Sequence, residues 1–316
     1  RGPVLSGEPP TGGVIVTTTN AGSGKQQASG ATAFAGVGSD GRRDLRASGV
    51  VSTANGFTLD AHAQKRENDG YRANQASEMK AGDVGGQWSN GTLRLGARYG
   101  QDDLDARLPG ALSAAQYAAD PSQADPANLG DHASIRNERA TAFAQAELGS
   151  WQLAFHAGQR RKKLRSVNFG FPFDYDVDAD NYALRAREEV AVGTARNALV
   201  LGFDANDWRR DVLGAFPAVA HQRTRAFYAK DDVTLASGTR ISLGARTENV
   251  EKDESGSGTS LDDREHAWEV GVSHPFAPGW TGYARTGRSF RLANVDEFSF
   301  TSPGVVLRPQ VSQDTE

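Results

Sequence analysis

The strongest constraint on the fold of this chain is a two-residue alternation of apolar with polar or glycine residues. The alternation runs through residues 57–64, 92–99, 199–204, 241–246 and 268–273. Successive side chains of a strand point to opposite faces, so each segment predicts a strand with one apolar face. Helical periodicity is almost absent. The pattern therefore predicts an all-β chain.

Tight turns and longer polar connectors alternate between these strands. The tight turns are Asn55-Gly56, Asn90-Gly91, Gly149-Ser150, Thr194–Asn197, Ser237-Gly238 and Pro278-Gly279. The longer connectors are predicted at about 68–77, 105–134, 166–178, 210–220, 253–263 and 292–307, and only the first connector, Ser39–Arg42, is short where the pattern requires a long one. Asn-Gly supplies the positive φ of a type I′ hairpin turn. The count is about thirteen strands from Ala28 to Arg291, with a fourteenth starting near Arg308.

An antiparallel meander with tight turns at one rim and long loops at the other is typical of an outer-membrane β-barrel. Mean hydropathy is −0.55 and no run of eighteen apolar residues exists, which excludes a transmembrane helix but not transmembrane strands of alternating polarity. The alternative is a soluble β-protein, whose strands are usually shorter. Strand 226–235 is less regular, because Asp231 interrupts its apolar side.

Composition narrows the range of functions. The net charge of −4 gives no support for nucleic-acid binding, and the absence of Cys excludes disulfides and thiol chemistry. None of the common catalytic motifs is present, so the chain is not expected to be an enzyme. The six His residues lack the spacing of a local metal site, and no metal site is predicted; His62 and His156 are expected to point into a barrel lumen.

Four segments resemble the TonB-dependent outer-membrane transporters. Arg1-Gly2-Pro3 followed by Gly12-Gly13-Val14-Ile15 resembles the end of that family's plug domain. Asp69-Gly70-Tyr71-Arg72 is similar to the close of an early barrel strand. The segment 283–297 resembles a late barrel strand and its loop, with Ala293 where Pro is common, and Arg308-Pro309 resembles the start of the next strand.

The resemblance implies a fragment of a larger receptor. Residues 1–20 are expected to be the C-terminal end of the plug, and residues 21–316 a partial TonB-dependent receptor-like β-barrel. The fold class is then all-β, a transmembrane antiparallel up-and-down barrel with about 13–14 of roughly 22 strands. The natural gene product is expected to be longer, because an open sheet in lipid leaves unpaired edges.

Basic and aromatic residues mark the expected extracellular rim. Phe169, Phe171, Phe173 and Tyr175 recur by twos beside a basic run, and they predict a face that grips a flat or catechol-like ligand. The basic candidates for ligand binding are Arg160, Arg161, Arg209, Arg210, Arg288 and Arg291. Clustered cations favour an anionic substrate on inward positions or lipopolysaccharide phosphates on outward ones. The alternatives are solvated charges and a loop that packs on itself. Residues 111–119 predict a short helix in a loop that acts as a mobile gate.

The resemblance implies active transport across the outer membrane of a Gram-negative bacterium. The expected cargo is a scarce, bulky nutrient, and a ferric siderophore is the first choice; no covalently bound cofactor is implied. Expected partners are TonB, through a segment upstream of residue 1, together with outer-membrane lipid, lipopolysaccharide and a small-molecule substrate. The protein is expected to be a monomer that binds no nucleic acid. The alternatives are a passive porin-like barrel, or TonB-dependent uptake of haem, cobalamin or another cofactor.

Overall fold

The computed structural model describes residues 28–256, 258–293 and 307–316. The strands are β1 (Gly30–Val37), β2 (Arg43–Ser52), β3 (Phe57–Asn68), β4 (Ser77–Ser89), β5 (Leu93–Arg107), β6 (His132–Leu148), β7 (Trp151–Asn168), β8 (Phe171–Pro172), β9 (Asp174–Val192), β10 (Ala195–Leu213), β11 (Ala218–Thr234), β12 (Arg240–Glu254), β13 (Thr259–Ala277), β14 (Trp280–Arg291) and β15 (Gln310–Thr315). Between β5 and β6 lie the helix α2 (Ala114–Ala119) and the 3₁₀ turn η1 (Pro126–Asn128). No helix in these ranges is long and apolar enough to cross a membrane.

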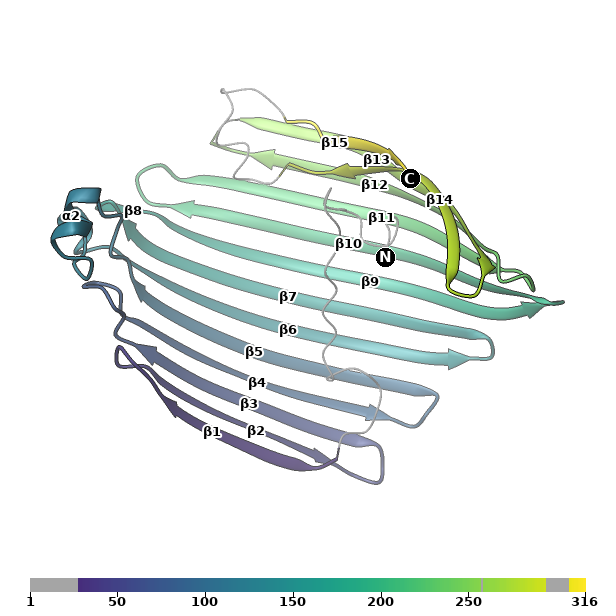
Figure 1. Cartoon of the computed structure of the whole chain (residues 1–316), viewed down its shortest axis with the longest axis horizontal. Coiled ribbons are helices and arrows are strands. Elements are labelled where there is room, and N and C mark those ends of the chain that lie inside the picture. The colour runs from purple at the N-terminus through teal and green to yellow at the C-terminus, as the bar shows by residue number, and fades with distance from the viewer. Residues whose placement is uncertain (1–27, 257, 294–306) are drawn as a thin grey trace.

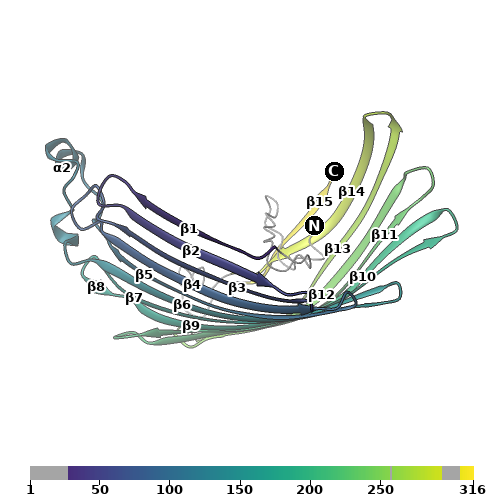
Figure 2. The same ribbon diagram turned by 90° about the horizontal axis from the view of Figure 1, so that it is seen from below.

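All the strands belong to one antiparallel sheet in which neighbours in sequence are neighbours in space (Figure 1). The order is β1-β2-β3-β4-β5-β6-β7-β9-β10-β11-β12-β13-β14-β15, and β8 extends the hairpin by pairing with β7. Seen from the side, the sheet curves into an open trough (Figure 2). This confirms the predicted all-β, up-and-down partial barrel, with thirteen main strands between Gly30 and Arg291 and a further one at β15.

The connectors differ more sharply in length than the sequence indicates. The tight turns are present at one rim. Gly56 and Gly91 have φ of 86° and 94°, but Asn55 and Asn90 do not have positive φ, so these two turns are not the expected type I′. At the other rim, only the connectors 69–76 and 108–131 are long among those described. The predicted long connectors 166–178, 210–220 and 253–263 are wrong: β7 and β9, β10 and β11, and β12 and β13 continue through most of these residues. Their polar residues still alternate and find cross-strand partners, so they extend the sheet instead of leaving it.

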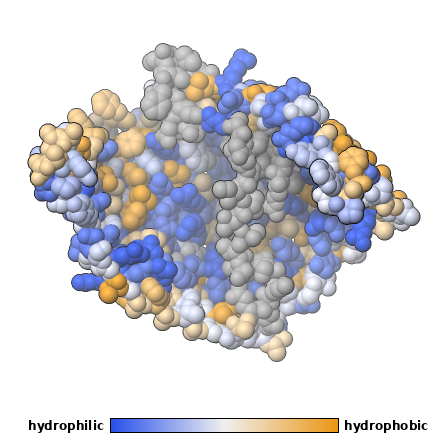
Figure 3. All heavy atoms as spheres, in the orientation of Figure 1, coloured by the Kyte–Doolittle hydropathy of each residue, from blue (hydrophilic) through white to orange (hydrophobic). Residues whose placement is uncertain are grey.

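The two faces of the sheet carry different residues. Large apolar side chains such as Leu184, Leu201 and Phe227 lie on the convex face and are 52%, 41% and 61% exposed. The hollow of the trough is mainly hydrophilic (Figure 3). There Arg98 of β5 reaches across Gly85 to bond Asp60 of β3 as well as Asp83 of β4. A Cβ at position 85 would lie 2.7 Å from the Arg98 guanidinium, so Gly leaves room for this bridge.

The apolar band on the convex face crosses the strands at a slant. One row of registered partners begins at Leu59 on β3, passes Tyr182 on β9 and ends at Arg264 on β13. The row therefore changes from apolar to charged while its residues stay on the same face. Such a drift is expected when strands tilt by about 35–45° in a barrel. With this tilt, the apolar band stays at one level along the barrel axis although it crosses the strands at a slant.

The expected plug segment, residues 1–20, lies outside the described residues, as does most of the connector 292–307. The description of the fold therefore applies to the barrel portion.

Candidate ligand site on the concave wall

The predicted aromatic residues lie on one continuous hairpin formed by β7, β8 and β9. Asn168 pairs with Phe171, Val167 with Pro172, and Leu164 with Tyr175, all in one register. Phe169 and Phe171 lie at the tip, 65% and 74% exposed. Phe173 and Tyr175 lie further down, where their rings meet edge to face at 5.7 Å between centroids. The hairpin thus divides the four aromatics into a pair at the tip and a pair in mutual contact, which we call the packed pair and in which Phe173 is still 47% exposed.

Two cations surround the packed pair and form with it what we call the mouth cluster: Lys162, Phe173, Tyr175 and Arg210. The Lys162 ammonium donates to the Tyr175 hydroxyl at 2.8 Å and lies 5.0 Å from its ring centroid. The Arg210 guanidinium lies 4.7 Å from the Tyr175 centroid and 5.8 Å from that of Phe173. Cations over aromatic faces are attracted by about 0.5–2 kcal/mol. This arrangement presents positive charge and flat apolar surface side by side.

Lys162 was not among the predicted ligand residues, although the two-residue period does contain a signal for it. Lys162 and Arg160 are two apart on β7, so both point to the concave face, and Arg160 donates to the Asn137 side chain at 3.0 Å. Across the sheet, Lys162 is registered with Val177, and Val177 with Arg210. Strand parity therefore identifies Lys162, but only once the strand is known to extend this far.

Of the basic residues predicted on β7 and β10, the odd-numbered Arg161 and Arg209 point to the convex face, away from the mouth cluster. Arg161 forms an ion pair with Asp178 at 3.5 Å, and Arg209 with Asp211 at 2.8 Å. Both have carboxylate partners on their own face, which neutralise them. We call these two ion pairs, which lie on the convex surface beyond the apolar band, the convex lattice.

The remaining two predicted residues come from β14. Arg288 forms an ion pair with Glu265 at 2.9 Å. Arg291 lines a cavity of about 920 Å³ lower on the concave wall. Neither belongs to the mouth cluster. The ten predicted ligand residues are therefore spread over the hairpin tip, the mouth cluster, the convex lattice and the β14 end, with Arg160 bonded to Asn137 on the concave face outside the cluster.

The cavity on the concave wall is lined by residues of β6, β7, β9, β10, β11, β12 and β14, both polar and apolar. It includes His156, consistent with the lumen orientation predicted for this residue. At its floor Arg246 bridges Asp204 and Glu248, each at 2.8 Å, and its side chain is only 3% exposed. The guanidinium groups of Arg246 and Arg185 also lie over the Tyr228 ring, at 5.4 and 6.0 Å from its centroid. The wall thus holds a buried charge network around Arg246.

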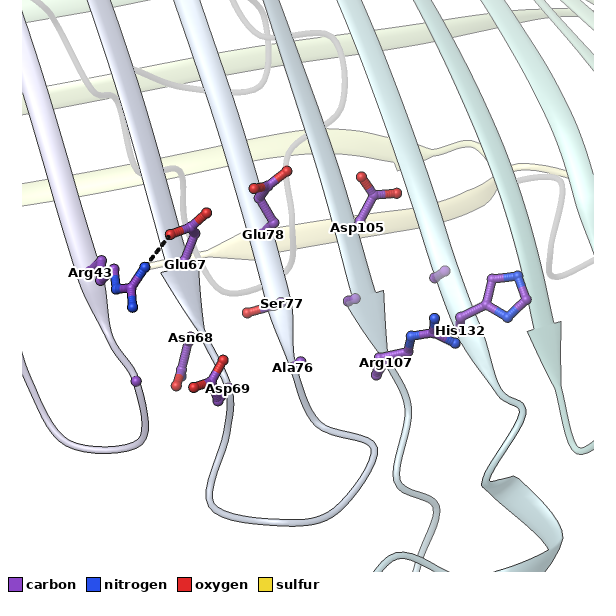
Figure 4. Close-up of a pocket in the computed structure, with 13 residues that line it drawn as sticks. Arg43, Glu67, Asn68, Asp69, Ala76, Ser77, Glu78, Asp105, Arg107 and His132 are labelled. Atoms are coloured by element: carbon purple, nitrogen blue, oxygen red, sulfur yellow. Dashed lines mark ion pairs between the residues drawn. The ribbon is translucent and has the colours of Figure 1, made fainter.

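A second pocket, of about 520 Å³, lies where β2 to β6 meet their loops (Figure 4). Glu67, Glu78 and Asp105 form a row of carboxylates across it, and Arg43 pairs with Glu67 at 3.9 Å. Lys65 contacts both Glu67 and Glu78. Lysine partners occupy Glu67 and Glu78, and the described residues hold no group of three or more His, Cys, Asp or Glu that fits a metal ion. None of the predicted ligand residues lines this pocket.

The long loop 108–131 contains the predicted helix, observed as α2 over Ala114–Ala119. Ser113 and Gln116 cap it reciprocally, each side chain bonding the backbone N–H of the other. The loop is also tied to its neighbour 69–76: Arg72 donates to the carbonyls of Pro109, Gly110 and Gln123. The helix is thus part of an anchored block, whereas the predicted gating motion stays a prediction.

Comparison with known protein families decides what kind of barrel this is. Residues 103–316 match the family model described as TonB dependent receptor-like, beta-barrel. The chain belongs to this family. The family and the similar structures are receptors and transporters, not enzymes. The chain has no match among curated protein sequences.

Solved structures of TonB-dependent receptors share the fold at low sequence identity. The ferric-catecholate import receptor Fiu of E. coli K12 matches with a TM-score of 0.75 and 14% identity, over 92% of this chain and 55% of Fiu. The alcaligin receptor FauA of Bordetella pertussis matches with 0.71 and 15%, over 92% and 48%. The copper transporter OprC matches with 0.64 and 14%, over 84% and 46%. The chain spans about half the length of these relatives.

Proposed function

We propose that this TonB-dependent receptor barrel lies in the outer membrane of a Gram-negative bacterium and imports a ferric siderophore. The observation that carries the proposal is the mouth cluster, in which two cations flank two aromatic rings on the concave wall. An anionic chelate with flat iron-binding groups matches both properties, because the cations attract its charge and the rings cover its apolar faces. Several similar structures are receptors for ferric chelates, which supports this cargo class.

The proposed partners follow from the same assignment. TonB would engage a segment upstream of residue 1 and supply the energy of the inner-membrane proton gradient. The convex apolar band would contact lipid, and the convex lattice beyond it would lie among lipopolysaccharide headgroups. Because Arg161 and Arg209 already have carboxylate partners, they are poor candidates for phosphate binding. The protein would act as a monomer, with no resident cofactor.

The proposal is tested with the full gene product in outer-membrane vesicles and a panel of ferric catecholates, ferric hydroxamates, haem and cobalamin. We expect Arg210→Ala and Tyr175→Leu to weaken binding of one ferric siderophore at least tenfold. Arg161→Ala, on the opposite face of the same hairpin, is the matched control and should leave binding unchanged. Tight binding of haem or cobalamin, with no siderophore bound, would overturn the cargo assignment.

Uptake separates this proposal from the passive-barrel alternative. Cells that express the protein should accumulate the bound chelate only when TonB is present, while surface binding persists without TonB. Accumulation that is unchanged by loss of TonB would identify a porin-like channel.

A further inference from the structure

The tip of the β7–β8 hairpin has an unfavourable residue for its geometry. Asn168 and Phe171 pair directly, which leaves Phe169 and Gly170 as a two-residue turn. Their φ angles are 52° and 75°, and a type I′ turn requires positive φ at both central positions. Gly accepts this geometry readily and Asn tolerates it, but a Phe side chain is disfavoured by the contact of its Cβ with the backbone. The turn needs support from elsewhere.

Asp131 provides that support from outside the hairpin. Its carboxylate accepts the backbone N–H of Phe169 at 2.6 Å and that of Gly170 at 3.1 Å. The side-chain amide of Asn128 donates to the same carboxylate. Asp131 and Asn128 are both buried, each 1% exposed. Charge-assisted bonds to two adjacent N–H groups fix the turn in the conformation that Phe169 alone would avoid.

Asp131 is itself held by the anchored loop block. Asn74 donates through its side-chain amide to the carbonyls of Leu108, Asn128 and Asp131. With the bonds from Arg72, these contacts join the connectors 69–76 and 108–131 into one unit. Asp131 therefore links this unit to the aromatic hairpin, 38 residues away in sequence.

We propose that Asp131 is a positioning residue for the ligand site: by clamping the Phe169-Gly170 turn, it sets the hairpin whose next residues are Phe173 and Tyr175. The β8 pairing and the bond from Phe173 N–H to the Ser166 carbonyl (2.8 Å) carry the turn geometry directly into the mouth cluster. The consequence is that the loop block and the ligand site are coupled: displacing the loop loosens the hairpin, and binding at the cluster stabilises the loop. The link to ligand binding depends on the proposed function, but the clamp itself does not.

The test replaces Asp131 by Asn in the full gene product. Asn keeps the shape but loses the charge and places an amide beside backbone donors, so the turn should loosen. We expect at least tenfold faster hydrogen exchange in the peptide 165–175 and at least tenfold weaker binding of the ferric siderophore. The matched control is Asp125→Asn, which alters a carboxylate of the same loop that caps η1 by accepting the Ala127 N–H.

Rescue distinguishes positioning from a general structural role. Phe169→Asn creates an Asn-Gly turn, which adopts type I′ geometry without help. Adding Asp131→Asn in this background should then change exchange and affinity less than twofold. The same cycle covers the case in which the single variant fails to fold. An equal loss in both backgrounds, or no effect of Asp131→Asn in the native background, would overturn the clamp. If Arg210→Ala leaves binding intact, the proposed function fails, while the exchange measurement still tests the clamp.

Discussion

The two faces of this sheet are made by alternate residues of the same strands, yet they differ in how their charged residues are buried and paired. On the concave wall, charges bridge two strands at a time and become buried, as Arg246 does between Asp204 and Glu248. On the convex face, Arg161 meets Asp178 at a side-chain exposure of 58%. Below that level the convex face is apolar. A shift of one residue along a strand thus separates a buried charge from an exposed apolar side chain.

The difference indicates that the contribution of an ion pair to the free energy of unfolding depends on the face on which it lies. A buried ion pair that loses one partner leaves an uncompensated charge, whereas an exposed pair is screened by water. Substitutions on the two faces should therefore differ in cost, and the loop clamp at the rim should show the smallest effect.

The largest effect is expected at the buried network. Arg246→Met should lower the free energy of unfolding by about 3–5 kcal/mol, because Asp204 and Glu248 lose their shared cation. Arg161→Met on the convex face should cost about 0–1 kcal/mol. Urea unfolding of the full gene product in phospholipid vesicles measures both. Equal costs would show that the concave wall is solvated like the outer surface.

The next effect concerns the apolar band. Leu184→Lys places a charge on the convex face and should cost about 2–4 kcal/mol in the same unfolding assay. The neighbouring Ala183→Lys points into the cavity, where residue 183 is registered with Asp204, and should cost less than about 1 kcal/mol. If Ala183→Lys proved the more damaging of the two, the assignment of the faces would be reversed.

Asp231 is an exception to the difference between the two faces, because it is a charged residue within the apolar part of the convex face. It lies on the convex face, registered with Leu199 and Leu243, and accepts a bond from the Asn197 amide at 2.6 Å. Replacing both partners, Asn197→Leu with Asp231→Leu, should stabilise the barrel by about 1 kcal/mol, because neither polar group is left unpaired. Asp231→Leu alone should stabilise less. Destabilisation by the double variant would indicate that the pair has a polar contact on this face.

The smallest effect is the response of the loop clamp to acid. The Asn128 amide, with the N–H groups of Gly170 and Phe169, holds the pKa of the Asp131 carboxyl below its ordinary 3.8, against the opposing effect of burial. The nearby His132 favours the ionised carboxylate as well. Since the folded pKa is lowered, the clamp's contribution is complete above pH 3.8 and is lost as the pH falls through the folded value. Exchange in the peptide 165–175 should therefore be constant from pH 7 to 5, after correction for intrinsic rates, and accelerate only below 3.8. Acceleration already between pH 7 and 5 would show that a group other than the Asp131 carboxyl controls the turn.

The sequence predicts the fold well because its signals are local. Parity along a strand and Gly in a tight turn each involve a few neighbouring residues, and the strand count follows from them. The lengths of β7 and β9 cannot be predicted in this way. The pattern in a stretch such as 166–178 is compatible both with a loop and with a strand that extends beyond the membrane. Cross-strand pairing decides between these possibilities, and pairing is not visible in a single segment.

The candidate site shows the same limit. The basic run 160–163 indicates that both faces receive cations, but not which ones meet a carboxylate. That outcome depends on register, which brings Asp178 opposite Arg161 and Val177 opposite Lys162. Asp131 offers no signal at all in the sequence, because its two acceptor bonds go to a turn that is distant along the chain.

The strict register of the hairpins also limits how such a barrel accepts changes in length. Adding one residue inside a strand exchanges its inner and outer sides from that point onward, so lysines would enter the hydrocarbon and leucines the water. Adding two residues only lengthens the strand and leaves its inner and outer sides unchanged. The irregularity between Pro275 and Ala277, where the pairing with β14 shifts, shows how an odd residue is absorbed near a turn. Corresponding strands of homologous barrels should therefore differ in length by even numbers of residues, with insertions of an odd number confined to the ends of hairpins.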